Sequence, residues 1–343
     1  MKKRTFMSLA GAVALAATSL LSTTQIALAD NPSDLNVAVI LSAGLESAWD
    51  GSLIEALERA KAAEPHGLDI NWQYTDPLWG DDAGDAMRLF AESGEFDVIW
   101  AHSTYSDQVK KLKDEFPEIL FVVVGSGNEG LGGNQYWVYK RVHEAAYVLG
   151  VMAGKMTSSN TLGVVGTFPA DDVNDEINAF FAGARSVNAD IAGKVAFIES
   201  WYDPGKASEM TAAQISTGAD MIFSLAGNFK PCEAEGLLCF GNFSDQHGYS
   251  PKSVVSSALA NWDPDVDWII NEWWANKADG TAFNGNSEII WRGMADGGAM
   301  IAPYQGLADK VPADVKALVD ETVANIKSGA LVVEIDVSDA TGN

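Results

Sequence analysis

The feature that most constrains the fold is one complete β-turn-α-β unit in residues 193–225. It reads as a buried strand, a helix and a second buried strand, which we place at residues 195–200, 207–217 and 219–226. A crossover helix between two such apolar runs makes the strands parallel and the connection right-handed. Ligands of open parallel sheets bind beyond the carboxyl ends of the strands, and here that position holds Trp201 and Tyr202. We therefore expect a ligand site at this turn.

The same alternation of strand and helix runs through most of the chain. It begins near residue 35, pauses at residue 140, restarts with a helix and continues to about residue 258. Two α/β halves of similar size predict an α/β fold of two doubly wound parallel-sheet lobes that face each other across a cleft and are joined by a hinge.

The last part of the chain breaks this alternation. It contains a Trp-rich helix, a short strand and an amphipathic helix, which we place at residues 266–275, 288–292 and 311–328. These pieces are too few for a third lobe, so we expect the chain to cross back and complete both. We place an N-terminal lobe at 36–140 with 259–296 and a C-terminal lobe at 141–258 with 297–338.

The first 29 residues have the pattern of a cleavable signal peptide. Lys2, Lys3 and Arg4 precede an apolar run, and an Ala-Leu-Ala cleavage site ends at Ala29. No cysteine lies near that site for lipid anchoring, and no later apolar run reaches the ~18 residues of a membrane span. We expect an exported protein of the periplasm that is not lipid-anchored, with about 314 residues after cleavage.

The chain is strongly acidic. Cleavage would remove three positive charges and change the formal net charge from −25 to −28, which argues against nucleic-acid partners. The length suits two lobes, and we expect a monomer. Cys232 and Cys239, the two cysteines, could form a disulfide in an oxidising compartment or remain two buried thiols.

Common catalytic and metal-binding motifs are absent. The sequence has no GxSxG, GxxxxGK[ST], HExxH or CxxC motif, and its four histidines share no metal-ligand spacing. We therefore expect no cofactor, no metal and no enzymatic activity. Glu46 and Asp50 could act as an acid-base pair, although four residues apart at a helix start they are more simply acceptors or helix N-terminal charges.

Several short segments, spread over nearly the whole chain after the signal peptide, form a recognisable set. They are GVMAGKM (150–156), ARSVNA (184–189), WYDP (201–204), SDQ (244–246) leading to PK (251–252), NW (261–262) and WRGMADGGAMIAP (291–303). With them the sequence resembles the basic membrane protein family of ABC-transporter substrate-binding proteins, whose known members bind purine nucleosides or purine bases. The resemblance implies a type I periplasmic-binding fold that closes on its ligand by a hinge and delivers it to a membrane permease.

The chain departs from the family pattern at the first strand end. Where the family has a DxxFN-like pattern, this chain has Glu46, Trp49 and Asp50. Nucleoside-binding members also carry a lysine that reaches the ribose, and Ser256 occupies that position here. The resemblance therefore carries over the fold, and it leaves both the exact ligand and ribose recognition open.

Ten residues are candidates for ligand binding, because each follows a strand end or matches a family segment. They are Glu46, Trp49, Asp50, Trp79, His102, Phe168, Trp201, Asn228, Asp245 and Trp262. Each also has a structural reading: the tryptophans could pack the core, the hinge or the surface, His102 could make a structural hydrogen bond, and Asp245 could cap a helix.

Two hypotheses of function remain. The first is a periplasmic binding protein of an ABC importer for a purine-like base or nucleoside, held by aromatic stacking and carboxylate acceptors. The altered residues also leave room for a sugar-like or cationic solute. The second is an exported hydrolase that acts on nucleosides with paired carboxylates, which product formation on incubation with nucleosides would reveal.

Overall fold

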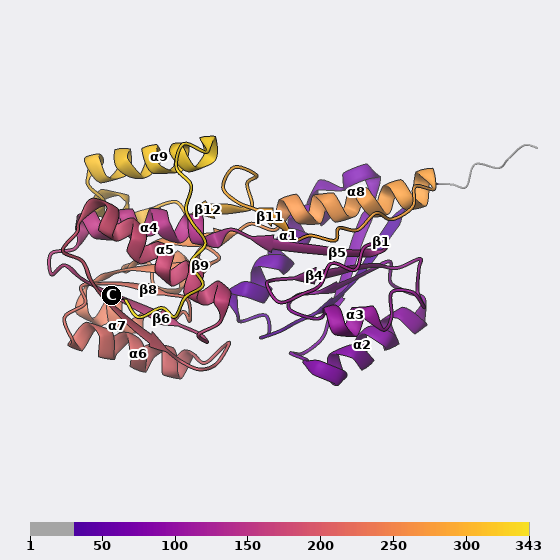
Figure 1. The fold of residues 1–343 in the computed structure, drawn as a ribbon, viewed down its shortest axis with the longest axis horizontal. Coiled ribbons are helices and arrows are strands. Elements are labelled where there is room, and N and C mark those ends of the chain that lie inside the picture. Colours follow the sequence, from indigo (N-terminus) through magenta and orange to yellow (C-terminus); the bar gives the residue numbers. More distant parts are fainter. Residues whose placement is uncertain (1–30, 343) are drawn as a thin grey trace, which may run out of the picture. The chain divides into compact units, whose positions relative to one another are not determined.

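The computed structural model describes residues 31–342, and the chain from Pro32 onward forms one compact unit. The expected signal peptide, residues 1–29, lies outside the described residues. Figure 1 shows that the described part contains two α/β lobes, each built on one six-stranded sheet. The strand order is β11-β5-β4-β3-β1-β2 in the first sheet and β12-β10-β9-β8-β6-β7 in the second. The prediction of two parallel-sheet lobes is confirmed.

Both sheets are almost entirely parallel. The strands of the first sheet are β1 (Asp34–Ile40), β2 (Asp69–Tyr74), β3 (Val98–Ala101), β4 (Leu120–Val124), β5 (Gln135–Lys140) and β11 (Ile290–Arg292). Those of the second are β6 (Thr161–Gly166), β7 (Ala192–Phe197), β8 (Met221–Ser224), β9 (Leu238–Phe243), β10 (Val254–Ala260) and β12 (Ala299–Ile301). In the described chain, β12 pairs antiparallel with β10 and the other neighbours pair parallel. The carboxyl ends of the parallel strands therefore share one edge of each sheet, where ligands bind.

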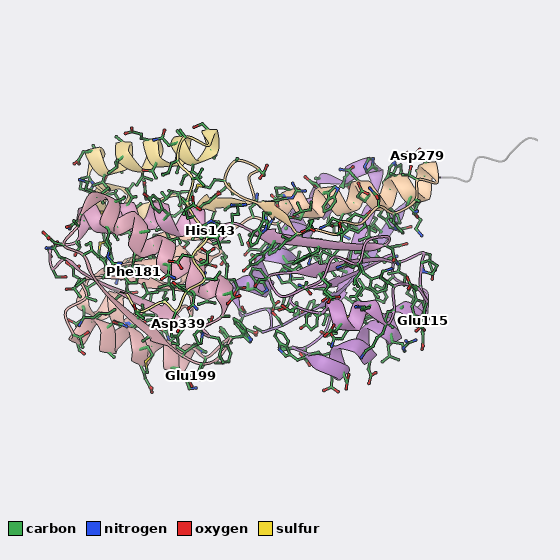
Figure 2. The ribbon with its side chains drawn as sticks, viewed as in Figure 1. Glu115, His143, Phe181, Glu199, Asp279 and Asp339 are labelled. Atoms are coloured by element: carbon green, nitrogen blue, oxygen red, sulfur yellow. A yellow bond between two sulfur atoms is a disulfide. The ribbon has the colours of Figure 1, made fainter. Side chains whose placement is uncertain are left out.

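Helices accompany each sheet. The helices of the first lobe are α1 (Ala48–Ala63), α2 (Gly80–Ser93), α3 (Ser106–Lys110) and α8 (Asp263–Asp279). Those of the second are α4 (Val142–Met156), α5 (Asp171–Val187), α6 (Pro204–Ser216), α7 (Lys230–Glu235) and α9 (Ala313–Ser328). Short 3-10 turns occupy Pro65–Gly67, Gln246–Tyr249 and Gln305–Lys310. In Figure 2, Glu115 and Asp279 mark the first lobe, and His143 and Phe181 the second.

The core lies on the faces of the central strands. β3 and β4, with the sequences VIWA and LFVVV, are buried along their whole length. Such unbroken apolar runs are expected where helices cover both faces of a parallel sheet. In the second lobe, α4 packs closely on α5, because Gly150 and Gly183 present no side chain at the contact.

Within residues 31–342 the chain passes between the two sheets three times, after β5, after β10 and after β11. The first crossing joins β5 to α4, the second joins β10 to α8, and the third joins β11 to β12. The tail thus contributes α8 and β11 to the first lobe and β12 to the second, while α9 packs on α4. The lobe boundaries 36–140 with 259–296 and 141–258 with 297–338 stay a proposal, and β10 of the second sheet runs two residues past the boundary at 258, to Ala260.

The opening β-turn-α-β unit differs in detail from the prediction. Its first strand, β7, begins at Ala192, three residues before the predicted 195–200, and lies at the edge of the sheet, where it is only partly buried. β6 lies between β7 and β8, so the crossover skips one strand. The error arose because an edge strand packed on one face can carry the same apolar run as a buried one.

Two further features of the described residues bear on the sequence predictions. Cys232 and Cys239 form a disulfide that joins α7 to β9, with 6.5 Å between their Cα atoms. The structure therefore contains a disulfide and not two buried thiols.

No helix among residues 31–342 has both the length and the apolar character needed to cross a membrane.

Candidate functional site

A cavity of about 480 Å³ lies where the carboxyl ends of the two sheets face each other. Segments after β1, β2, β3 and β4, together with Tyr139 of β5, line it from the first lobe, and segments after β6, β7, β8 and β9 line it from the second. Six of the ten predicted residues contribute to this region. Glu46, Trp49, Trp79, Trp201 and Asn228 line the cavity, while Phe168 lines an adjoining hollow of about 330 Å³.

Two tryptophans of the first lobe present ring surface to the cavity. The indole N–H of Trp49 donates to the backbone oxygen of His102 at 3.1 Å, and that of Trp79 donates to the backbone oxygen of Ser42 at 3.0 Å. Trp49 also stacks on the His102 ring, with centroids 4.8 Å apart and an angle of 23° between the planes. Both indole N–H groups already have acceptors, so the rings can offer a ligand mainly their π-faces.

Trp201 faces the cavity from the second lobe. Its side chain is 40% exposed, and its ring meets Phe168 edge to face with centroids 5.0 Å apart. Tyr202 is similarly exposed, at 41%, and lines the same wall. An aromatic ring that is supported at one edge and uncovered on a face is suited to stacking with a planar ligand.

Asp50 has a different role from the one predicted. It is fully buried and does not line the cavity; its carboxylate accepts the backbone N–H groups of Ser42, Ala43 and Gly44. Burial raises the pKa of Asp50 to about 6, and these hydrogen bonds oppose that rise. Asp50 therefore shapes the loop after β1 that holds Glu46 at the cavity.

Three other predicted residues also lie off the cavity wall. Trp262 is fully buried and donates its indole N–H to Ser52 Oγ at 3.0 Å. Asp245 is exposed, caps the 3-10 turn through the N–H of His247 and accepts a hydrogen bond from Gln305. His102 is buried behind Trp49. In each case local partners satisfy the side chain, which is the structural alternative noted from sequence.

Two carboxylates that were not predicted from the sequence also line the cavity. Glu176 and Asp172 lie on the first two turns of α5. The Tyr139 hydroxyl donates to Asp172 Oδ2 at 2.7 Å, and the Asn242 amide donates to Glu176 Oε2 at 2.7 Å. Burial raises the pKa of Asp172, and raises that of Glu176 well above its usual range. In the sequence, only their position shortly after a strand end indicated a role at the site. That indication was weak, because acidic residues at a helix start usually face solvent.

Three strand ends of the second lobe carry residues in the left-handed backbone region. Glu199, Asn228 and Phe243 follow or end β7, β8 and β9, with φ angles of 52°, 56° and 64°. Non-glycine residues in this region cost about 1–3 kcal/mol each, and such residues concentrate at ligand sites. Asn228 and Phe243 line the cavity, so the strain is located where the ligand would bind.

Contacts between the lobes close the bottom of the cavity. Trp49 of α1 meets Phe243 of β9 edge to face, with centroids 5.0 Å apart. The Tyr139–Asp172 hydrogen bond joins the end of β5 to the start of α5. The first pair joins two aromatic rings across the lobes, and the second joins an aromatic hydroxyl of the first lobe to the acidic start of α5.

His102 is expected to remain neutral throughout the ordinary pH range. Trp100 Nε1 donates to its Nδ1 at 3.2 Å, so the ring proton is on Nε2, which faces the Trp49 carbonyl oxygen at 3.2 Å. Burial lowers the pKa of His102 from 6.5 to about 3. Nitrogen NMR should show an unprotonated Nδ1 from pH 8 down to about 4.5, and a protonation step near pH 6 would contradict this arrangement.

The lowered pKa of His102 also makes the folding stability depend on pH. The unfolded chain binds a proton at His102 below pH 6.5, whereas the folded chain does so only near pH 3. The contribution of His102 to stability is therefore complete above pH 6.5 and declines by about 1.4 kcal/mol per pH unit as the pH falls toward 3.

Solved structures with a similar fold include solute-binding proteins of ABC transporters. One from Aeropyrum pernix K1 has a TM-score of 0.72 and 18% identity, and covers 88% of this chain and 94% of its own. One from Conexibacter woesei DSM 14684 has a TM-score of 0.70 and 19% identity, and covers 88% of this chain and 99% of its own. The fold is therefore that of type I periplasmic binding proteins, as predicted.

The family can be stated as well. The chain belongs to the family of PnrA-like ABC transporter substrate-binding proteins, whose model matches residues 35–329. A relative named purine-binding protein from Brucella abortus (strain 2308) is 31% identical over 74% of this chain and 69% of its own length. A relative named putative ABC transporter glucose-binding protein from Haloferax volcanii is 30% identical over 79% of this chain and 68% of its own length. The resemblance drawn from the sequence is confirmed, and the chain is a substrate-binding protein of an ABC transporter.

Proposed function

We propose that the cavity binds a planar purine-like base and that the chain delivers it to an ABC-transporter permease. The observation that carries this proposal is the arrangement of Trp49 and Trp79, whose indole N–H groups are used on backbone oxygens, so that their rings can act as stacking surfaces. Trp201 adds a third exposed ring from the opposite lobe. Relatives named purine-binding and nucleoside-binding proteins support the same class of ligand.

A free base fits better than a nucleoside. The position at which nucleoside-binding members carry a ribose-contacting lysine is Ser256 here, and its hydroxyl is buried and donates to the Ala302 carbonyl oxygen at 2.7 Å. Ser256 therefore cannot reach a sugar in the cavity. We propose further that the protein acts in the periplasm as a monomer without a lipid anchor, and binds its ligand without transforming it.

A sugar is the second candidate ligand. The Haloferax volcanii relative is named a putative glucose-binding protein, and carboxylates beside aromatic rings can also hold sugar hydroxyls. Titration calorimetry with adenine, guanine, guanosine and glucose distinguishes the two. Binding of glucose without binding of any purine would replace the first proposal by the second. Conversion of guanosine on incubation would favour the hydrolase.

Trp201→Ala is expected to weaken the binding of adenine or guanine about 5- to 150-fold. Stacking of a base on an aromatic side chain contributes about 1–3 kcal/mol, and about 1.4 kcal/mol corresponds to a tenfold change in affinity. Trp201→Phe should recover much of the loss, because it retains a π-face. Calorimetric titration gives the affinities, and melting curves report on folding.

The control for this prediction is Tyr74→Ala, which removes an exposed aromatic side chain, 48% accessible, that ends β2 and does not line the cavity. It should leave the affinity unchanged. If Trp201 only packs against Phe168, then Trp201→Ala would lower the melting temperature and leave the affinity of the folded protein intact. That outcome would remove Trp201 from the site.

A further inference from the structure

Glu176 differs from the other groups that line the cavity. Its side chain is 3% exposed, on the second turn of α5, yet it contributes to the cavity wall. One oxygen, Oε2, accepts a hydrogen bond from the Asn242 amide at 2.7 Å. The other, Oε1, accepts no hydrogen bond from any residue between 31 and 342. A deeply buried carboxylate with an unused acceptor atom is thus directed at the ligand space.

The surroundings of Glu176 supply no positive partner for that atom. The charged groups that act on it are the carboxylates of Asp172 and Asp175, which repel its charge. Asp172 is already bonded to the Tyr139 hydroxyl, and Asp175 to His143 Nδ1 and the backbone N–H of Asp336. Burial and these neighbours hold the pKa of Glu176 well above its usual range. An ionised Glu176 is therefore costly until a donor reaches Oε1.

We infer that Glu176 is the residue that determines ligand specificity, by accepting an N–H group from the edge of the ligand that enters the bottom of the cavity. The ligand class is a planar heterocycle with an amino or amidine-type N–H on that edge. This inference rests on the proposed function, which supplies the planar ligand, and adds which edge chemistry the protein selects. Asn242 is the positioning residue, since its amide holds Oε2 and so directs Oε1.

The chemistry of the atoms explains the selection. A ligand N–H group that reaches Oε1 offsets the cost of ionising Glu176, and the ionised carboxylate then accepts a charge-assisted hydrogen bond. An edge that presents a ring carbonyl or a bare ring nitrogen offers no N–H group, so it leaves Glu176 in its protonated form and lacks that charge-assisted hydrogen bond. A hydrogen bond to a charged group changes affinity by roughly 10- to 150-fold. Aromatic stacking favours any planar ring, so it cannot make this distinction.

Calorimetry with matched ligands tests the inference. Guanine and hypoxanthine differ by one amino group, as do 2-aminopurine and purine, and adenine and purine. The wild-type protein should bind the amino-bearing member of at least one pair 10-fold or more tightly. Glu176→Gln, of nearly the same shape, should reduce that ratio to about threefold or less, and Glu176→Asp should leave an intermediate ratio.

The matched control is Glu209→Gln, which removes an exposed carboxylate from α6 of the same lobe and away from the cavity. It should keep the wild-type ratio. Because Glu176 lies beside two like charges, Glu176→Gln should melt no lower than the wild type. A ratio that Glu176→Gln leaves unchanged, in protein that melts normally, overturns the inference.

A purine-independent pair separates this inference from the proposed function. Benzamidine, a cation at neutral pH, presents N–H groups next to a planar ring, and acetophenone keeps the planar ring but presents only a carbonyl oxygen, with no N–H group. If no purine binds, the proposed function fails, while a preference for benzamidine that is lost in Glu176→Gln and kept in Glu209→Gln still supports the role of Glu176. No preference for benzamidine and none among the purines overturns it.

Discussion

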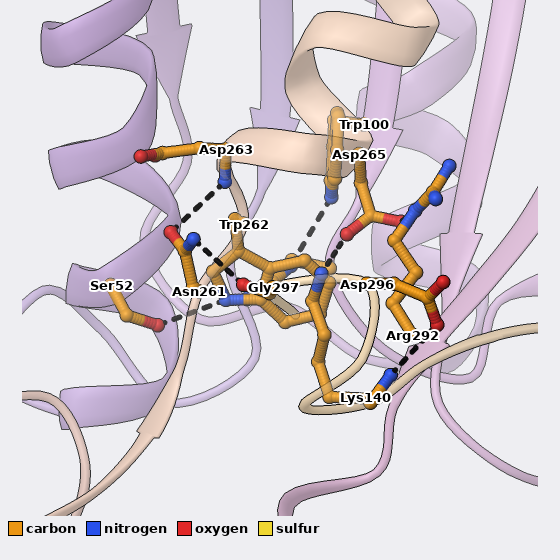
Figure 3. Close-up of polar contacts among 12 residues, drawn as sticks. Ser52, Trp100, Lys140, Asn261, Trp262, Asp263, Asp265, Arg292, Asp296 and Gly297 are labelled. Carbon is orange, nitrogen blue, oxygen red and sulfur yellow. Dashed lines mark hydrogen bonds and ion pairs between the residues drawn. The ribbon is translucent and has the colours of Figure 1, made fainter. Parts of the chain in front are cut away.

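Asp265→Ala is expected to lower the free energy of unfolding by about 3–5 kcal/mol, the usual cost of removing one partner from a buried ion pair. Asp265 is fully buried and pairs with the buried ammonium of Lys140 and with Arg292, whose Nε donates to Oδ1 at 2.8 Å (Figure 3). Without the carboxylate, the two cations lose the one buried counter-charge that both of them contact. The pKa of Lys140 is already held well below its usual range, by burial and by Arg292.

Lys140, Asp265 and Arg292 form a charged cluster beside the chain crossings between the lobes. Lys140 ends β5, Arg292 ends β11, and Asp265 lies in the first turn of α8, so each is next to one of the three crossings described above. The Lys140 ammonium also lies 4.5 Å from the centroid of the Trp262 ring, which compensates part of its lost hydration. We therefore expect Asp265→Ala to disturb the crossings before it disturbs either sheet.

Asp263→Ala is the matched control for this prediction. Asp263 lies two residues earlier on the same helix and pairs with Arg59 at 2.7 Å, but the two side chains are 40% and 50% exposed. Surface ion pairs contribute about 0–1 kcal/mol, so this variant should stay within about 1 kcal/mol of the wild type. Urea denaturation measures both variants. An equal loss in the two would show that Asp265 is not a buried counter-charge.

A double variant, Lys140→Met with Asp265→Leu, tests whether the loss in Asp265→Ala comes from unpaired charge, because it removes both partners of the buried ion pair. Replacing a buried pair with apolar residues of similar volume is often neutral, so the double variant should recover more than half of the stability lost in Asp265→Ala. Failure to recover would locate the loss either in packing around Trp262, which contacts Lys140, or in the unpaired guanidinium of Arg292, and not in the Lys140 ammonium.

The fold was largely predictable, because parallel sheets leave a clear trace in sequence. Buried strands such as β4 appear as unbroken apolar runs, and the restart of the pattern after Lys140 separates the lobes. Strand order was not predictable, because an edge strand such as β7 shows the same apolar character as a central one. The disulfide also remained open, since spacing alone does not bring two sulfur atoms together.

The candidate site was predictable only in part. Trp49, Trp79 and Trp201 were found because each follows a strand end, and strand ends meet at the cavity. Asp50 has a side chain suited to ligand binding, but three backbone N–H groups use it. Glu176 was missed for the opposite reason: its position near a helix start suggests exposure to solvent, and only the three-dimensional packing around α5, including Asn242 of β9, buries it. Which acceptors remain unused is decided by three-dimensional contacts.

Gly150→Ala is expected to lower the free energy of unfolding by about 2–3 kcal/mol, and Gly150→Val by more. A Cβ atom at Gly150 would lie 1.9 Å from the backbone oxygen of Phe180 in α5 and 3.0 Å from the backbone nitrogen of Ala184. A side-chain rotation cannot relieve a clash with backbone, so α4 and α5 would have to move apart, and such overpacking costs about 1–3 kcal/mol or more. Urea denaturation measures the change.

Helix propensity alone predicts the opposite sign, since alanine is favoured over glycine by about 1 kcal/mol inside a helix. Gly84→Ala in α2 is therefore the matched control: its Cβ would meet only the flexible side chain of Gln108, at 3.3 Å, so this variant should be neutral or up to about 1 kcal/mol more stable. A gain in both variants would contradict the close α4–α5 contact. A loss in Gly150→Ala alone would show that this contact sets the position of α5, the helix that carries Asp172 and Glu176 into the cavity.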